Sequence, residues 1–163
     1  MKKVAKHLKE TIELVAPLLQ DITDDEAAVK PKPEKWSKKE ILGHLLDSAC
    51  NNQQKFLRTM MAPDVQFVGY QQDEWVELQK YNDVKWKTLI KWWERTNEHL
   101  AHIIKNAKKD TLQHTIKIVN DGPFTLEFIM TDYVEHLKHH LKQILPDVDL
   151  ESSFENVYPS GTV

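Results

Sequence analysis

Apolar residues recur every three or four positions in four segments of the chain, which is the spacing of one face of an α-helix. The segments cover about residues 2–22, 37–62, 83–108 and 125–145. The remaining positions of each segment are mostly polar, as in helices that bury one side only. Four amphipathic helices in one chain predict an all-α fold, a four-helix bundle.

Two of the predicted helices have clear start and stop signals. Ser37 is a typical N-cap, and Glu40 three residues later completes a capping box for the second helix. Thr125 is expected to cap the fourth helix. Pro63 and Pro146 are expected to end the second and fourth helices, because proline cannot donate a backbone hydrogen bond.

Proline also shapes the connections. Pro17 predicts a kink or a break in the first helix. After the acidic run Asp24-Asp25-Glu26, residues 30–35, with Pro31 and Pro33, predict an extended linker. Residues 63–82 form a longer connection with a short helix expected at about 74–80. A connection of this length is typical of a crossover, so simple up-down-up-down wiring is not expected.

The last third of the chain holds one strong turn signal, Asn120-Asp121-Gly122-Pro123, after a weakly alternating stretch. We expect a short hairpin or an extended loop there, before the fourth helix. Residues 146–163 have little pattern and are interpreted as a C-terminal tail that wraps the bundle loosely. The folded domain is therefore predicted to be residues 1–145.

The charge balance excludes a typical nucleic-acid-binding protein. There are 22 Lys and Arg against 25 Asp and Glu, a net charge of −3, and pairs such as Lys38-Lys39 are interpreted as solvated surface. Cys50 is the single cysteine, so no intramolecular disulfide can form. No apolar run is long enough to span a bilayer and no signal-peptide core is visible, so a cytoplasmic chain without membrane contact is expected.

Three histidines form a candidate metal site. His136 and His140 are four residues apart in the last helix, so both imidazoles can point from one face. His44 of the second helix borders the apolar stripe and can face the bundle axis. Three neutral imidazoles from two helices can hold zinc or nickel and leave coordination positions open. The alternative is a hydrogen-bonded core His44 with His136 and His140 on the surface, because His-x-x-x-His alone is a weak motif.

Nearby polar residues have open roles. Asp47 and Asn51 follow His44 on the same helical face, and they can orient a ligand, contact a substrate or form a polar stripe. Tyr133, one turn before His136, can donate its hydroxyl to the site or pack in the core. These three are the candidate catalytic residues. His139 is expected to point outward, and four further histidines fit no ligand set with the three: His7, His99, His102 and His114.

Several motifs, in this chain order, resemble one family. They are Pro33-Glu34-Lys35-Trp36-Ser37, Gly43-His44-Leu45-Leu46-Asp47-Ser48, Tyr70-x-x-Asp73-Glu74-Trp75 and Tyr133-x-x-His136-x-x-His139-His140-Leu141. Together they resemble the DinB/YfiT-like superfamily of small bacterial four-helix bundle proteins, over about residues 30–145. The branch of metal-dependent hydrolases and bacillithiol transferases looks closest.

The resemblance implies that His44, His136 and His140 are the family's metal triad, with zinc or nickel, an up-down-down-up bundle and a homodimer. The thiol transferases of the family attach a low-molecular-weight thiol to an electrophile. We therefore expect a metal-dependent enzyme that activates a small thiol for S-transfer, or a water molecule for hydrolysis. The alternative is a non-catalytic, stress-related binding module in which the metal is structural or absent.

Overall fold

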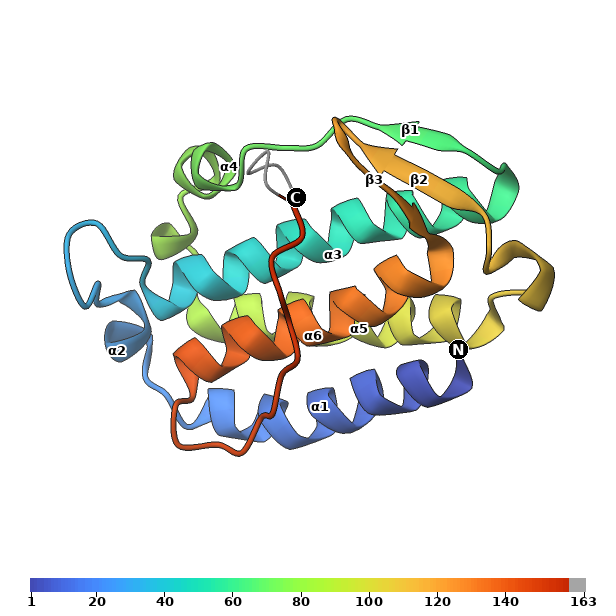
Figure 1. Cartoon of the computed structure of the whole chain (residues 1–163). Helices are drawn as coiled ribbons and strands as arrows, with labels where there is room; N and C mark the ends of the chain where they lie inside the picture. The colour runs from blue at the N-terminus through green and yellow to red at the C-terminus, as the bar shows by residue number, and fades with distance from the viewer. Residues whose placement is uncertain (159–163) are drawn as a thin grey trace.

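Four long helices dominate the computed structural model, which describes residues 1–158 (Figure 1). They are α1 (Lys2–Gln20), α3 (Lys38–Met61), α5 (Trp86–Asn106) and α6 (Leu126–Ile144). Both α5 and α6 pack against α1 and against α3, so α1 and α3 occupy opposite corners. Figure 1 shows the chain running one way along α1 and α6 and the other way along α3 and α5. The predicted helical bundle is confirmed.

The second and fourth long helices begin at the capping residues that the sequence predicted. The Ser37 hydroxyl accepts a hydrogen bond from the Glu40 backbone N–H at 3.1 Å, and the Glu40 carboxylate accepts one from the Ser37 backbone N–H at 2.8 Å. The Thr125 hydroxyl accepts a hydrogen bond from the Phe128 backbone N–H at 3.1 Å. Pro17 lies inside α1, which continues to Gln20, so the helix is not broken there.

The segment between α1 and the predicted linker holds a short helix that the sequence did not predict. Asp24–Ala28 form the short helix α2, which begins with a capping box between Thr23 and Glu26. The Asp24 carboxylate accepts a hydrogen bond from the Lys39 ammonium at 2.9 Å, and Lys39 is only 3% exposed. The interpretation of the Lys38-Lys39 pair as solvated surface was therefore wrong for Lys39.

The crossover between α3 and α5 contains a strand as well as a helix. Strand β1 (Val65–Phe67) precedes the predicted helix, α4 (Gln72–Gln79), and a 3₁₀ helix at Tyr81–Asp83 follows it. Strand β1 pairs in parallel with β2 (Thr115–Ile118), which pairs antiparallel with β3 (Asp121–Thr125). The all-α prediction allowed for the β2–β3 hairpin but missed the three-stranded sheet, because a three-residue strand carries no readable alternation.

The hairpin turns earlier than the turn signal predicted. Val119 and Asn120 form the turn, and Val119 has a φ of 55°. Gly122, with a φ of 100°, and Pro123 lie inside β3, where the register with β2 shifts. Glycine adopts such a φ without strain. The signal therefore marks an irregular strand rather than the turn itself.

One apolar core fills the space between the four long helices. The sheet adds Ile116 and Ile118 to this core, and the largest fully buried side chains include Trp86 and Trp93 of α5. The segment after α6 also contributes, because Leu150 and Tyr158 are each 4% exposed. Within residues 1–158, no helix is long and apolar enough to cross a membrane.

Lys55 of α3 is a buried charge near this core. Its side chain is 1% exposed, and its ammonium nitrogen lies 5.5 Å from the centre of the Phe67 ring. Burial lowers the pKa of Lys55 to about 8, although the charge of Asp132 acts in the opposite direction. Because the unfolded chain keeps this proton up to about pH 10.4, stability should rise as the pH rises from about 8 toward that value.

Lys55→Met is expected to stabilise the protein at pH 7 by about 1–3 kcal/mol, since an apolar side chain of similar length replaces a buried charge. Urea unfolding at pH 7 and at pH 9 measures the effect, and the gain should shrink at the higher pH. The matched control is Lys142→Met, at an exposed position of α6, which should change little. A loss of stability in Lys55→Met at pH 7 would show that the fold needs the ammonium group.

Candidate metal centre

His44 reaches the bundle interior from the first half of α3, on a helix that packs against α6. Its side chain is 0% exposed. The preceding residue, Gly43, lets the crossover approach the helix closely, because a Cβ there would lie 2.1 Å from the Tyr81 ring. The position of His44 is thus defined by the capped helix on one side and the crossover on the other.

His136 and His140 enter from α6, one helical turn apart. The Nε2 atoms of His44 and His136 are 3.4 Å apart, and the ring centroids of the three histidines are 5.3, 4.7 and 4.6 Å from one another. One ligand nitrogen from each residue lies within 4.8 Å of the others. The structure therefore brings the three predicted ligands together.

The donor set fits a divalent ion. Nitrogen ligands at about 2.05 Å from a tetrahedral zinc ion are about 3.3 Å apart. The two facing Nε2 atoms are at 3.4 Å, close to that separation. Imidazole nitrogens also suit nickel. Within residues 1–158, no carboxylate or thiol joins this cluster, so an ion held here would keep coordination positions for another molecule.

Burial keeps the three imidazoles neutral. Loss of solvent is the main cause that lowers the pKa of His44 to about 3 and of His140 to about 4, and neighbouring histidines add to it. Burial also holds the pKa of His136 well below its ordinary range. Neutral imidazoles offer lone pairs to a cation with little competition from protons near neutral pH.

A tryptophan and an amide border the centre. The ring centroid of Trp36 lies 5.0 Å from that of His44, and the Gln143 carbonyl oxygen lies 3.4 Å from Nδ1 of His140. Trp36 belongs to the motif before the second predicted helix, whereas Gln143 was missed. Its spacing of three residues after His140 could have indicated it, because such positions are neighbours on a helix.

Phe154, in the segment after α6, also reaches the centre. Its ring centroid lies 5.1 Å from that of His136 and 5.5 Å from that of His139. Sequence reasoning missed this residue, since the tail has no periodic pattern. The tail was expected to wrap the bundle loosely, but Leu150 and Tyr158 are buried.

The other histidines are not part of the ligand group, although the ring centroid of His139 lies 5.2 Å from that of His140. His139 is exposed, as predicted. His114 pairs through Nδ1 with the backbone carbonyl of Thr59 at 2.7 Å. As expected, none of the remaining histidines in the described part of the chain joins a ligand group; these are His7, His99 and His102.

Asp47 connects α3 to the crossover. Its Oδ1 accepts hydrogen bonds from the Tyr81 hydroxyl at 2.8 Å and from the Gln79 amide at 2.6 Å. Its Oδ2 is buried and has no hydrogen-bond partner among residues 1–158. Burial raises the pKa of the Asp47 carboxyl, and the two hydrogen bonds partly oppose that rise.

Asn51 and Tyr133 also contact backbone and neighbouring helices. Asn51 donates from its amide to the backbone carbonyl of Asp47 at 2.9 Å. The Tyr133 hydroxyl donates to Oδ1 of Asn97 on α5 at 2.5 Å. In the part of the chain that the structure describes, Asp47, Asn51 and Tyr133 have no hydrogen bond or ring contact with the three histidines.

The sequence profile of the DinB superfamily matches residues 7–144 of the chain. The chain belongs to the DinB superfamily. The match includes the four long helices almost completely and all three histidines of the centre. The family resemblance seen in the sequence is thereby confirmed.

One curated relative is BH0277 of Halalkalibacterium halodurans, whose name describes it as a metal-dependent hydrolase. It is 22% identical over 109 residues, covering 67% of this chain and 63% of the relative. The chain therefore spans less than two thirds of the curated relative that it matches.

Two solved structures from Bacillus subtilis share the fold. YfiT, described as a metal-dependent hydrolase with an unusual four-helix bundle topology, gives a TM-score of 0.80 at 17% identity, covering 88% of this chain and 83% of YfiT. The DinB-like protein YjoA gives a TM-score of 0.61 at 14% identity, covering 94% of this chain and 99% of YjoA. At these identities the likeness establishes the fold alone.

A cavity of about 470 Å³ opens beside the centre of this DinB superfamily protein. Trp36 and Gln143, which contact the rings of His44 and His140, form part of its wall. The rest of the lining consists of the charged residues Glu34, Lys35 and Asp73 together with Pro31, Ile41 and Gln72. The three histidines are not among its lining residues, so Trp36 and Gln143 stand between this cavity and the centre.

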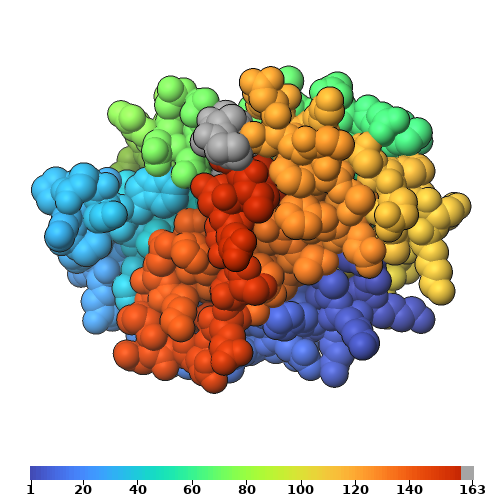
Figure 2. Space-filling view, in the orientation of Figure 1, coloured from blue at the N-terminus to red at the C-terminus, as the bar shows by residue number. Residues whose placement is uncertain are grey.

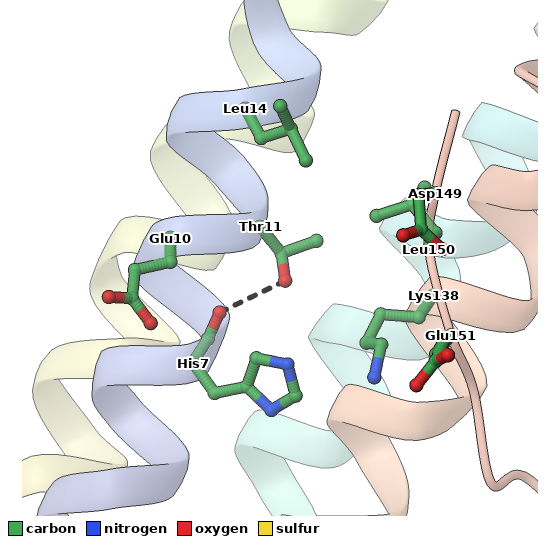
Figure 3. A pocket seen from close by; sticks show the side chains of 8 residues that line it. All are labelled: His7, Glu10, Thr11, Leu14, Lys138, Asp149, Leu150 and Glu151. Carbon is green, nitrogen blue, oxygen red and sulfur yellow. Dashed lines mark hydrogen bonds between the residues drawn. The ribbon is translucent and has the colours of Figure 1, made fainter.

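A second cavity, of about 400 Å³, lies between α1 and the segment after α6 (Figure 3). His7 and Thr11 of α1 face Lys138 of α6 across it, as Figure 3 shows. The Lys138 ammonium is paired with Glu135 at 3.1 Å. None of the residues lining this cavity belongs to the three-histidine centre.

Proposed function

We propose that this DinB superfamily protein is a metal-dependent enzyme that activates a low-molecular-weight thiol for S-transfer to a small electrophile, or a water molecule for hydrolysis. The observation that carries the proposal is the convergence of His44, His136 and His140, with facing Nε2 atoms 3.4 Å apart. The names of BH0277 and YfiT, both given as metal-dependent hydrolases, support the same class of activity.

The three histidines would hold the ion, for which zinc or nickel is proposed. When bound, such an ion supplies Lewis-acid chemistry that lowers the pKa of a coordinated thiol or water. The chain's own residues prepare this centre: burial keeps the imidazoles neutral, and Trp36 shields one side of His44 from water. The Gln143 carbonyl oxygen can accept a hydrogen bond from Nδ1–H of His140, which leaves the Nε2 lone pair free for the ion.

Substrates would approach through the cavity beside Trp36 and Gln143. The Trp36 ring suits an apolar part of an electrophile. Lys35 and Asp73 carry opposite charges on the same wall, which suits a small thiol with charged groups. We therefore assign this cavity as the substrate entrance.

The candidate catalytic residues Asp47, Asn51 and Tyr133 are assigned supporting roles around the centre. Asp47 holds the crossover against α3 through its bond to Tyr81, and Asn51 braces the backbone of Asp47. Tyr133 ties α6 to α5 through Asn97. Each would act by keeping the helices that carry the histidines in place.

Elemental analysis of protein purified without an affinity tag is expected to find about one zinc or nickel ion per chain. His44→Ala and His140→Ala each remove one of three ligands and should lower the bound metal at least about tenfold. The control is His102→Ala, at an exposed position of α5 outside the ligand group, which should keep its metal. The proposal is contradicted if the wild type binds far less than one metal ion per chain and His44→Ala binds the same amount.

Activity is tested with the metal-loaded protein. Several low-molecular-weight thiols are each combined with a chromogenic aryl electrophile, and ester and amide substrates are tested without thiol. Turnover that disappears when the metal is chelated and returns when it is added back supports a metal-dependent enzyme. Turnover of the electrophile with a thiol identifies S-transfer, and turnover of an ester or amide without thiol identifies hydrolysis.

The burial of His44 favours one alternative, a non-catalytic binding module with a structural metal, because a shielded ion contributes to folding rather than to turnover. Thermal unfolding with and without chelator separates the two functions. A large chelator-dependent loss of stability without any thiol or hydrolase activity would favour the binding module.

A further inference from the structure

The segment after α6 crosses the bundle as a strap. We name residues 149–158 the C-terminal strap; it lies beyond residue 144, where the DinB superfamily match ends. Figures 1 and 2 show it lying across α6 and continuing toward the crossover instead of leaving the surface. Leu150 and Tyr158, near its two ends, are each 4% exposed. Both ends of the strap are thus packed against the rest of the protein.

Hydrogen bonds dock the strap on the part of α6 that carries His136. The Ser152 hydroxyl donates to the backbone carbonyl of Glu135 at 2.8 Å, and the Ser153 backbone N–H donates to the Glu135 carboxylate at 2.9 Å. The Tyr158 hydroxyl donates to Oδ2 of Asp132 at 2.8 Å. These acceptors lie one and four residues before His136 on the same helix.

Phe154 lies between these anchors and covers the centre. Its ring meets that of His136 at 73°, with 5.1 Å between centroids, which is an edge-to-face contact. Such contacts have a preferred geometry and so restrict the orientation of both rings. His139, on the outer side, also contacts Phe154, with 5.5 Å between centroids. The strap therefore closes the centre on the α6 side.

The His136 ring lacks the usual orienting partner. A histidine that binds a metal normally donates its other N–H to a carboxylate, a carbonyl or a water. Among residues 1–158, the His136 side chain has no hydrogen-bond partner except Nε2 of His44. Nδ1 of His44 is buried and unpaired as well, and the ring of Trp36 packs against that imidazole. Among the described residues, Trp36 and Phe154 are the aromatic side chains that pack on these two rings and restrict their orientation.

We infer that Phe154 is a positioning residue of the three-histidine centre: it fixes the His136 ring for coordination, and the strap that carries it slows the exchange of the ion with solvent. The inference rests on the proposed metal centre. It assigns a role to a segment outside the part of the chain matched by the DinB superfamily.

Cobalt(II) serves as the probe, because its visible absorption reports ligand geometry. The wild type and Phe154→Ala are loaded with cobalt, and the spectrum and the rate of cobalt transfer to excess EDTA are recorded at pH 7.5. Phe154→Ala should shift the spectrum and release cobalt about 10- to 100-fold faster, the usual range for losing an orienting neighbour. Trp92→Ala is the control; this tryptophan of α5 is 51% exposed, and the variant should match the wild type.

Tyr158→Phe provides a second, milder test. It removes only the hydroxyl that anchors the strap to Asp132, so Phe154 stays present and release should accelerate less than in Phe154→Ala. A wild-type spectrum and release rate in Phe154→Ala overturn the inference, and so does a lower melting temperature without spectral change, which assigns the strap to the fold alone. A wild type that binds no cobalt, zinc or nickel overturns the metal centre itself.

Discussion

Gly43→Ala is expected to destabilise the protein, although the same exchange inside a helix usually stabilises by about 1 kcal/mol. A Cβ at Gly43 would stand 2.1 Å from Cδ2 and 2.2 Å from Cγ of Tyr81. These atoms are close to the base of a ring whose hydroxyl is bonded to Asp47, so rotation of the side chain cannot relieve the contact. We expect a net loss of about 2 kcal/mol or more.

Urea unfolding measures this loss, and a double-mutant cycle with Tyr81→Ala assigns it to one contact. Removing the Tyr81 ring alone should cost about 3 kcal/mol through the cavity it leaves. In that background, however, Gly43→Ala should cost nothing further, because the clashing atoms are gone. A cost that is the same in both backgrounds would mean that another neighbour, not Tyr81, excludes a side chain at this position.

The features that the sequence predicted best depend on residues close together in the chain. The capping box of Ser37 and Glu40 formed as expected, because both partners lie within one helical turn. The shared direction of His136 and His140 follows from helical spacing in the same way. The link to His44 was different. It needed the bundle as a scaffold, and the resemblance to a known family strengthened it.

The features that the sequence did not reveal depend on contacts between distant segments. Strand β1 exists because β2 offers it a parallel edge, and its own three residues carry no signal. Lys39 looked solvated because its partner, Asp24, belongs to a short helix that the sequence did not predict. Phe154 sits in a segment without periodicity, and only its docking on α6 brings it to His136. Tertiary packing determines all three.

The metal-free protein is expected to lose stability steeply between pH 7 and pH 5. The folded-state pKa is about 3 for His44 and about 4 for His140, and that of His136 is also strongly lowered. The unfolded chain takes up protons on these histidines near pH 6.5, whereas the folded chain does not, so unfolding is favoured as the pH falls. At pH 5 His44 and His140 account for about 2 kcal/mol each, and His136 acts in the same direction.

Urea unfolding of EDTA-treated protein across this range measures the slope. Burial raises the pKa of Asp47 and of Asp132, which acts in the opposite direction, so variants are needed to isolate the histidines. His140→Gln should flatten the slope by up to about 1.4 kcal/mol per pH unit, and His99→Gln, at an exposed position, should keep it. Saturating zinc should move the loss to lower pH, because the ion and the protons compete for the same lone pairs. If the unfolding free energy of His140→Gln has the same slope against pH as that of the wild type, the fold does not keep the His140 imidazole neutral. Protons would then compete with a cation for this ligand near neutral pH.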